Sequence, residues 1–248
     1  MKKLNVRAFF LIMLFVLTSF SLTPSVRLVE TSASHSNSVA GENEPDKPST
    51  FLLKNASKNT DVKIEIEKCG DGLCEGLAVV YLFKKDQTEP FQTISLPAMR
   101  FNLEKDGNPD EKSVIFDDFN FDGQEDLALR NGNNGQYAAA SFNILLFSKA
   151  KKQFVRNRML TKLASEFGGL FLVDQTKKQI ETRSVSGNAW SQTIRYQIVK
   201  DNPKKVYVFT VNGWGDNGKV ILTTEKLVNG KWKKTRKSVD KNEFYKEY

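Results

Sequence analysis

The stretch 62–67 reads Val-Lys-Ile-Glu-Ile-Glu, and its pattern recurs through most of the chain. Apolar residues at every second position predict a β-strand, because successive side chains of a strand point to opposite faces of a sheet. The same alternation recurs in three later runs, at 142–146, 194–198 and 206–211. Residue pairs that accept the positive φ angles of tight hairpins interrupt the runs at 131–132, 187–188, 212–213 and 229–230. We therefore predict an all-β fold of many short antiparallel strands, arranged as a sandwich or in a propeller-like way.

One segment has the apolar spacing of a helix instead. Leu160, Leu163, Ala164 and Phe167 lie three or four residues apart, as on one face of an amphipathic helix. A short helix is one interpretation of this segment, and a loop that leads into a strand at 170–173 is the other.

The first 21 residues have the order of a secretory signal peptide. A charged start at residues 2–7 precedes an apolar run at 8–17, and small and polar residues follow. The apolar run is shorter than the roughly 20 residues that span a bilayer, so we predict cleavage, with an uncleaved membrane anchor as the alternative. Cleavage could follow Ser21 or Ala40. The mature protein is then expected in the periplasm or outside the cell, without a membrane span.

Residues 22–50 are predicted to form a flexible leader, and residues 51–248 a single all-β domain. The leader is rich in Ser, Asn, Glu and Pro, and such a segment buries too little apolar surface to offset its ordering entropy. The remaining length is ample for one core. Loss of Lys2, Lys3 and Arg7 lowers the formal charge from +8 to +5. This charge favours an acidic partner, and a solvated surface with spare lysines is the alternative.

Two cysteines enclose a short turn in Cys69-Gly-Asp-Gly-Leu-Cys74. In an oxidising compartment so close a pair most naturally forms a disulfide, and the intervening glycines allow the turn. One half of a zinc site is the alternative. That alternative lacks ligands, because no second cysteine pair exists and the only histidine, His35, lies in the leader.

Residues 116–129 read Phe-Asp-Asp-Phe-Asn-Phe-Asp-Gly-Gln-Glu-Asp-Leu-Ala-Leu and contain the strongest functional motif. Oxygen-bearing residues recur at every second position, and calcium takes about six to eight oxygen ligands at flexible geometry. We predict a calcium site between two strands, with Gly123 at the sharp turn. The predicted ligands are the side chains of Asp118, Asn120, Asp122 and Asp126 and the backbone carbonyl of Gln124. An acidic turn without an ion is the alternative.

The spacing Asp-x-Asn-x-Asp-Gly-x-x-Asp-Leu at 118–127 resembles the calcium loops of EF-hands and of integrin-α-like β-repeat domains, although Leu129 stands where an EF-hand has glutamate. A wider pattern resembles one bacterial family. It comprises the cysteine hairpin and strand at 69–83, Gln-Thr-Ile at 92–94, the calcium loop, and a Gly- and Tyr-bearing loop and strand at 131–147. That family contains periplasmic immunity proteins against lysozyme-like effectors of type IV secretion systems. The resemblance implies a calcium-binding protein that occludes the active site of a peptidoglycan hydrolase.

Two loops carry candidate partner-binding residues. In the loop 131–137, Gln136 and Tyr137 could enter a partner's cleft, because tyrosine offers rigid apolar area and a hydroxyl. An ordinary hairpin with Tyr137 packed at its base is the alternative. Trp214 is a second candidate in a glycine-rich loop, and Trp190 has a similar context. A small satellite core is the alternative for both tryptophans.

The sequence argues against an enzyme. Nucleophilic triads and Cys-His pairs need a histidine in the fold, and His35 lies in the leader. No phosphate-binding glycine loop or dinucleotide fingerprint is present. Carboxylates are plentiful, but nothing places two across a cleft, so a carboxylate-based hydrolase is the weakest hypothesis. We expect a protein partner and no nucleic acid, with a glycan-binding cell-envelope module as the other hypothesis.

Overall fold

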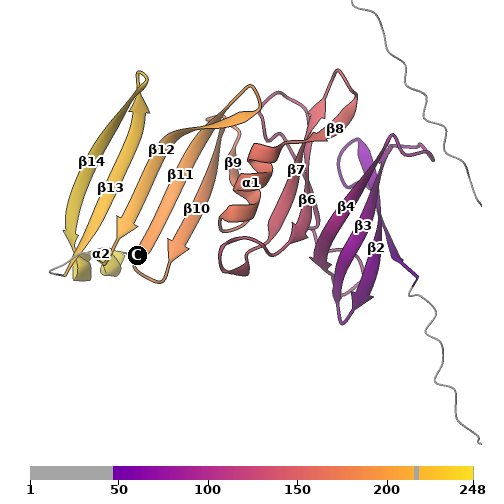
Figure 1. Cartoon of the computed structure of the whole chain (residues 1–248), viewed down its shortest axis with the longest axis horizontal. Helices are drawn as coiled ribbons and strands as arrows, with labels where there is room; N and C mark the ends of the chain where they lie inside the picture. Colours follow the sequence, from indigo (N-terminus) through magenta and orange to yellow (C-terminus); the bar gives the residue numbers. More distant parts are fainter. Residues whose placement is uncertain (1–46, 215–217, 248) are drawn as a thin grey trace, which may run out of the picture. The chain divides into compact units, whose positions relative to one another are not determined.

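The computed structural model describes residues 47–214 and 218–247, so the predicted signal peptide and most of the predicted leader lie outside the described residues. The described residues form one compact unit, built mainly from antiparallel strands (Figure 1). The all-β prediction is confirmed. No helix within these two ranges is long and apolar enough to cross a membrane.

Within the described residues, three sheets follow one another along the chain, and in each of them strands adjacent in sequence pair with each other. The first sheet contains β1 (Ser49–Leu53), β2 (Thr60–Gly70), β3 (Leu73–Lys84) and β4 (Gln92–Asn102). The second contains β5 (Val114–Asp117), β6 (Asp126–Gly132), β7 (Ser141–Ser148) and β8 (Gln153–Arg156). The third contains β9 (Leu172–Asp174), β10 (Gln179–Ser186), β11 (Trp190–Val199), β12 (Asn202–Asn212), β13 (Lys219–Val228) and β14 (Lys231–Asp240).

In the part of the chain that the structure describes, two α-helices accompany the sheets, and a 3-10 turn spans Gln136–Ala138. The first helix, α1 (Arg158–Glu166), contacts β7 and β12 (Figure 1). Asn157 caps it, because its side-chain oxygen accepts the N–H of Leu160 at 2.9 Å. The helical interpretation of this segment is therefore confirmed. The second helix, α2 (Lys241–Glu247), follows the last strand and contacts β13 and β14.

The central strands of the second sheet, β6 and β7, are buried on both faces, because successive residues of each strand are buried almost without interruption. Leu127 and Leu129 pack into a core shared with the first sheet. Ala128, which points the other way, packs into a second core shared with α1 and with Ile180 and Ile194 of the third sheet. These two cores join three sheets into layers, so the sandwich-like prediction is confirmed.

The propeller-like alternative gains no support from the sheet topology. Each strand order is linear, so none of the three sheets closes on itself in the described part of the chain.

The hairpin signal at 229–230 proved accurate, whereas the pair at 131–132 lies within β6. Asn229 and Gly230 both have positive φ, 50° and 75°, and connect strands in which Val228 faces Lys231, as predicted. The predicted disulfide is also present. Cys69 on β2 faces Cys74 on β3 and is bonded to it, beside a turn in which Gly72 has a φ of 76°.

Candidate metal loop and exposed aromatic residues

The predicted calcium loop connects β5 to β6. These strands are antiparallel, and Asp117 lies opposite Asp126, so the loop sits between strands as predicted. Gly123 has a φ of 82° and Phe121 a φ of 63°. The two left-handed residues turn the chain tightly, and glycine takes such a conformation at little cost.

Side-chain oxygens of this loop point inward, toward the backbone amides of the loop itself. The Asp118 carboxylate accepts the N–H groups of Asp122 at 3.0 Å and of Gly123 at 2.8 Å. The Asn120 side-chain oxygen also accepts the Asp122 N–H, at 3.2 Å. The Asp122 carboxylate accepts the Gln124 N–H at 2.9 Å. The first three predicted ligands are thus held on the inner side of one turn.

Asp126 is fully buried and links the loop to β7. Its two carboxylate oxygens accept the N–H of Phe119 at 2.9 Å and the N–H of Phe147 at 2.8 Å. The pKa of Asp126 is raised to about 7, mainly by burial and to a smaller degree by the negative charges of Asp118 and Asp122, while the two amide hydrogen bonds oppose the shift. A nearby cation would stabilise the charged form of a carboxylate buried in this environment.

The donor set fits calcium in its chemistry. All five predicted ligands offer oxygen, and a carboxylate oxygen that accepts one amide hydrogen bond keeps a second lone pair. Within residues 47–214 and 218–247, however, no three acidic, histidine or cysteine side chains converge closely enough to form a metal cluster. Binding would therefore require the Asp118 and Asp122 carboxylates to turn toward one ion, and calcium stays a prediction.

Two residues that tie the loop to the third sheet were missed by the sequence argument. Asn120 donates its side-chain N–H to the Asp201 carboxylate at 2.9 Å. Gln175 donates to the Asp117 carboxylate at 2.9 Å and to the Asp118 carbonyl at 3.1 Å. Asp201 lies between β11 and β12, and Gln175 lies between β9 and β10. No local pattern identifies such contacts, because the partners are far apart in sequence.

The two candidate residues of the 131–137 loop differ in their surroundings. Gln136 is half-buried, and its side-chain amide donates to the Val185 carbonyl and accepts the Val185 N–H, the latter at 2.9 Å. It therefore fixes the loop to β10 rather than projecting toward a partner. Tyr137 is 70% exposed, with a φ of 54°. Its hydroxyl oxygen accepts the N–H of Gly187 at 3.2 Å.

Trp214 lies beside the same turn as Tyr137. Its side chain is 61% exposed, and a Cβ added to Gly187 would lie 4.0 Å from the Trp214 ring. The fold thus places both Tyr137 and Trp214 beside Gly187 in the β10–β11 turn, although 77 positions separate them in the sequence. Trp190 is half-buried at the start of β11 and lines a pocket on the third sheet.

Comparisons with known proteins give one informative likeness. A scan against protein-family models finds no match, and a search of curated proteins finds none either. A solved structure described as that of a Xanthomonas type IV secretion system related protein is similar, with a TM-score of 0.62 and 19% identity. The alignment covers 79% of this chain and 97% of that chain. At this identity the likeness shows a common fold.

Proposed function

We propose that this protein is an exported, calcium-binding inhibitor that occludes the active site of a lysozyme-like peptidoglycan hydrolase, as an immunity protein does. Three observations support the proposal. The disulfide between Cys69 and Cys74 is typical of an oxidising compartment such as the periplasm. The fold is similar to that of a type IV secretion system related protein. The sequence resembles a family whose members block lysozyme-like effectors.

The observation that carries the proposal is the exposed Tyr137 on a rigidly held turn. Tyr137 and Ala138 both have positive φ, 54° and 58°, a conformation that costs a residue other than glycine energy. Hydrogen bonds of the neighbouring Gln136 hold this turn in place. The N–H of Gln136 donates to the Phe167 carbonyl at 3.0 Å, and its side chain bonds to Val185. A side chain presented in a fixed position loses little entropy on binding.

Tyr137 also has the chemistry to enter a glycosidase cleft. Such clefts use a pair of carboxyl groups. Because the Tyr137 hydroxyl oxygen accepts the Gly187 N–H, its hydrogen remains available to donate to a carboxylate. Trp214 adds exposed apolar area beside it, and exposed aromatic residues of this kind mark protein interfaces. The positive charge of the chain complements an acidic cleft.

Calcium would have a structural role in this proposal. An ion held by Asp118, Asp122 and Asp126 would neutralise the negative charge of their carboxylates and fix the ends of β5 and β6. The same loop bonds to Gln175 and Asp201 of the third sheet. Calcium would therefore stabilise the contact between the second and third sheets, and binding to the folded state alone would raise its stability.

The test compares variants in the hydrolysis of cell walls by lysozyme-like enzymes of several classes. We expect Tyr137→Ala to weaken inhibition of the sensitive enzyme about 30-fold or more, the loss typical of a central interface residue. Tyr137→Phe separates hydroxyl donation from ring packing. Trp232→Ala is the matched control, because Trp232 is an exposed aromatic residue on β14. The proposal would be contradicted if Tyr137→Ala inhibited fully, or if the wild-type protein at micromolar concentration inhibited none of the enzymes.

A further inference from the structure

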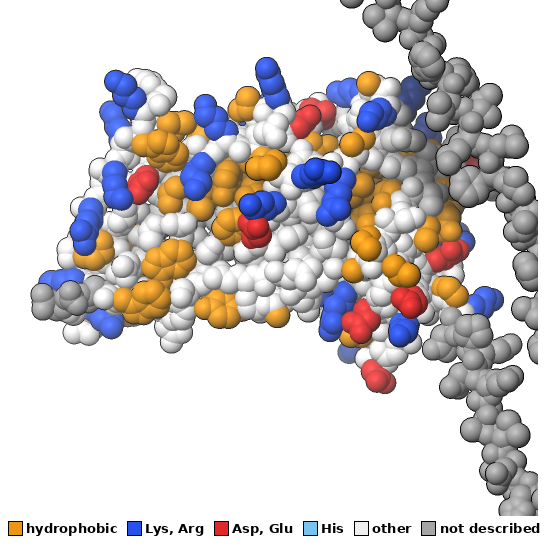
Figure 2. All heavy atoms as spheres, viewed as in Figure 1, with side chains coloured by type: hydrophobic (Ala, Val, Ile, Leu, Met, Phe, Trp, Pro, Cys, Tyr) orange, Lys and Arg blue, Asp and Glu red, His pale blue; other side chains and the backbone are white. Residues whose placement is uncertain are grey.

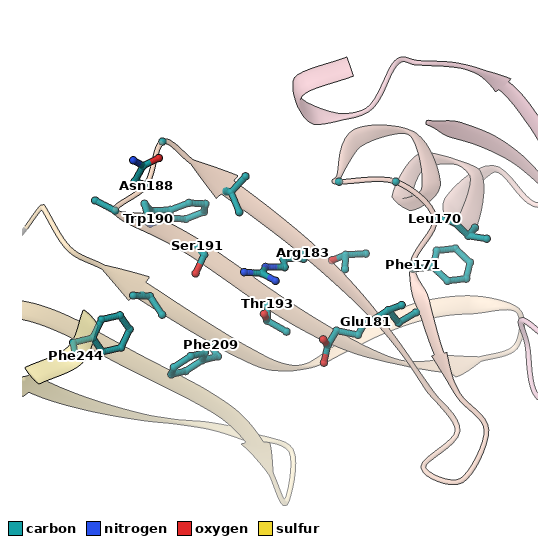
Figure 3. A pocket seen from close by; sticks show the side chains of 18 of the residues that line it. Leu170, Phe171, Glu181, Arg183, Asn188, Trp190, Ser191, Thr193, Phe209 and Phe244 are labelled. Atoms are coloured by element: carbon teal, nitrogen blue, oxygen red, sulfur yellow. The ribbon is translucent and has the colours of Figure 1, made fainter. Parts of the chain in front are cut away.

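A pocket of about 630 Å³ lies on the third sheet, within the size range of small-molecule sites. Residues of β10, β11 and β12 form its floor. The segment 168–172 forms one side, and Phe244 and Tyr245 of α2 form the other (Figure 3). The described side chains that line it are mostly apolar or aromatic.

Strand register explains the floor. Arg183 faces Thr193, which in turn faces Phe209, so these three side chains lie in one row on one face of the sheet. Figure 3 shows Arg183, Thr193 and Phe209 on three adjacent strands, with Ser191 beside Thr193 on β11. Residues on the opposite face, such as Ile180 and Ile194, are buried in the second core. The pocket therefore occupies the face of the sheet that the core leaves open.

The walls are fixed by close contacts. The N–H of Gly168 donates to the Arg183 carbonyl at 3.1 Å, which holds the 168–172 segment against β10. A Cβ added to Gly213 would lie 2.8 Å from the Tyr245 hydroxyl, so α2 approaches the end of β12 closely. Contacts of this kind hold the pocket open in a defined shape without a ligand.

Charge distinguishes this pocket from an ordinary apolar hollow. Glu181 and Arg183 are the charged residues among its described lining. Glu181 is already neutralised, because its carboxylate accepts a hydrogen bond from Arg195 at 2.7 Å. The Arg183 guanidinium has no carboxylate or hydrogen-bond partner among the described residues. On the face of the molecule turned toward the viewer in Figure 2, hydrophobic and basic side chains are interspersed.

We propose that this pocket binds a small organic carboxylate. The acid group would pair with Arg183, whose planar guanidinium matches a carboxylate in two parallel hydrogen bonds. The ring or chain of the ligand would cover Phe209 and Trp190, and the hydroxyls of Ser191 and Thr193 would bond its polar substituents. The pocket adjoins the Tyr137 turn, because Val185 and Gly187 line it and bond to Gln136 and Tyr137, but the proposal does not depend on inhibition of a hydrolase.

The experiment is an NMR titration of the full mature protein with two acids, N-acetylmuramic acid and 3-phenylpropanoate. Each has a neutral counterpart, N-acetylglucosamine and 3-phenylpropanamide. We expect the acids to shift the amide signals of Arg183, Ser191 and Phe209, and the neutral compounds to do so at least about 10-fold more weakly. The preferred acid identifies the source, because N-acetylmuramic acid reports a sugar acid and 3-phenylpropanoate reports an aromatic acid.

Arg183→Met keeps the apolar stem of the side chain and removes the charge. Its affinity for the preferred acid should fall about 10-fold or more, the effect of losing a charged hydrogen bond. Lys233→Met is the matched control, because Lys233 is an exposed cation on the same sheet and outside the pocket. If Arg183→Met binds as well as Lys233→Met, or if neither acid shifts these signals at about 10 mM, well above ordinary affinities, the proposal is overturned.

Discussion

The substitution Asp126→Asn separates the structural role of the buried carboxylate from its predicted role as a calcium ligand. In the structure both oxygens of Asp126 accept backbone N–H groups. An asparagine side chain has one acceptor oxygen, so one buried N–H would face the amide nitrogen and lose its partner. Such a loss costs about 1–3 kcal/mol. For a domain of this size it lowers the melting temperature by about 2–4 °C per kcal/mol.

Calcium adds a second effect that the same variant should lose. At a calcium concentration about 100 times the dissociation constant, an ion that binds the folded state alone stabilises it by about 2.7 kcal/mol. By the same conversion the wild-type melting temperature should rise by about 5–11 °C between chelator and calcium. Asp126→Asn should show a much smaller rise, because one charged ligand is gone.

Differential scanning calorimetry in chelator and in calcium measures both effects. Asp117→Asn is the control, since Asp117 is a neighbouring carboxylate outside the predicted ligand set that bonds to Gln175. It should keep the calcium-dependent rise. Identical wild-type melting in chelator and in calcium would refute the metal-site reasoning, and an equal rise in Asp126→Asn would exclude Asp126 as a ligand.

Three further outcomes follow from the structure. The pKa of Asp126 is raised from 3.8 to about 7 in the folded state, so between these pH values the folded metal-free protein binds more protons than the unfolded chain. Its free energy of unfolding should therefore fall as the pH rises from about 4 to about 7. Urea titrations in chelator measure this dependence on pH, and Asp126→Asn should weaken it. Gln136→Ala removes both hydrogen bonds to Val185 and should lower the free energy of unfolding, measured in a urea titration, by about 1–3 kcal/mol. The variant should also weaken inhibition. Unchanged inhibition would show that these hydrogen bonds are not needed to position Tyr137. Replacing Cys69 and Cys74 by serine should cost about 2 kcal/mol, since the closed loop is short, and a loss above twice that value would contradict the loop-entropy argument.

Sequence patterns predicted the parts of the fold that depend on local rules. Alternation predicted strands, the Asn229–Gly230 pair predicted its hairpin, and the spacing of Cys69 and Cys74 predicted their bond. The predicted calcium loop lies between two strands because its apolar flanks are themselves strand sequences. Each of these features is decided by residues that are near one another in the chain.

Local sequence patterns could not predict the contacts between segments that are distant in the chain. Gln136 has the composition of a loop tip, yet its side chain bonds to Val185, 49 positions away. Asp126 was interpreted only as a metal ligand, and its bond to the Phe147 N–H depends on the pairing of β6 with β7. The pocket at Arg183 exists because α2 and the 168–172 segment close two sides of one sheet face. The packing of whole elements decides such features, and the periodicity of the sequence does not predict that packing.

If Tyr137 occludes the active site of a hydrolase, one molecule of this protein should inhibit one molecule of the enzyme. The most direct measurement titrates a fixed concentration of the sensitive lysozyme-like hydrolase, set well above the dissociation constant, with the mature protein while cell-wall hydrolysis is followed. Occlusion by Tyr137 predicts a linear fall in activity that ends at one inhibitor per enzyme. Activity that persists at a several-fold excess of the protein would contradict it.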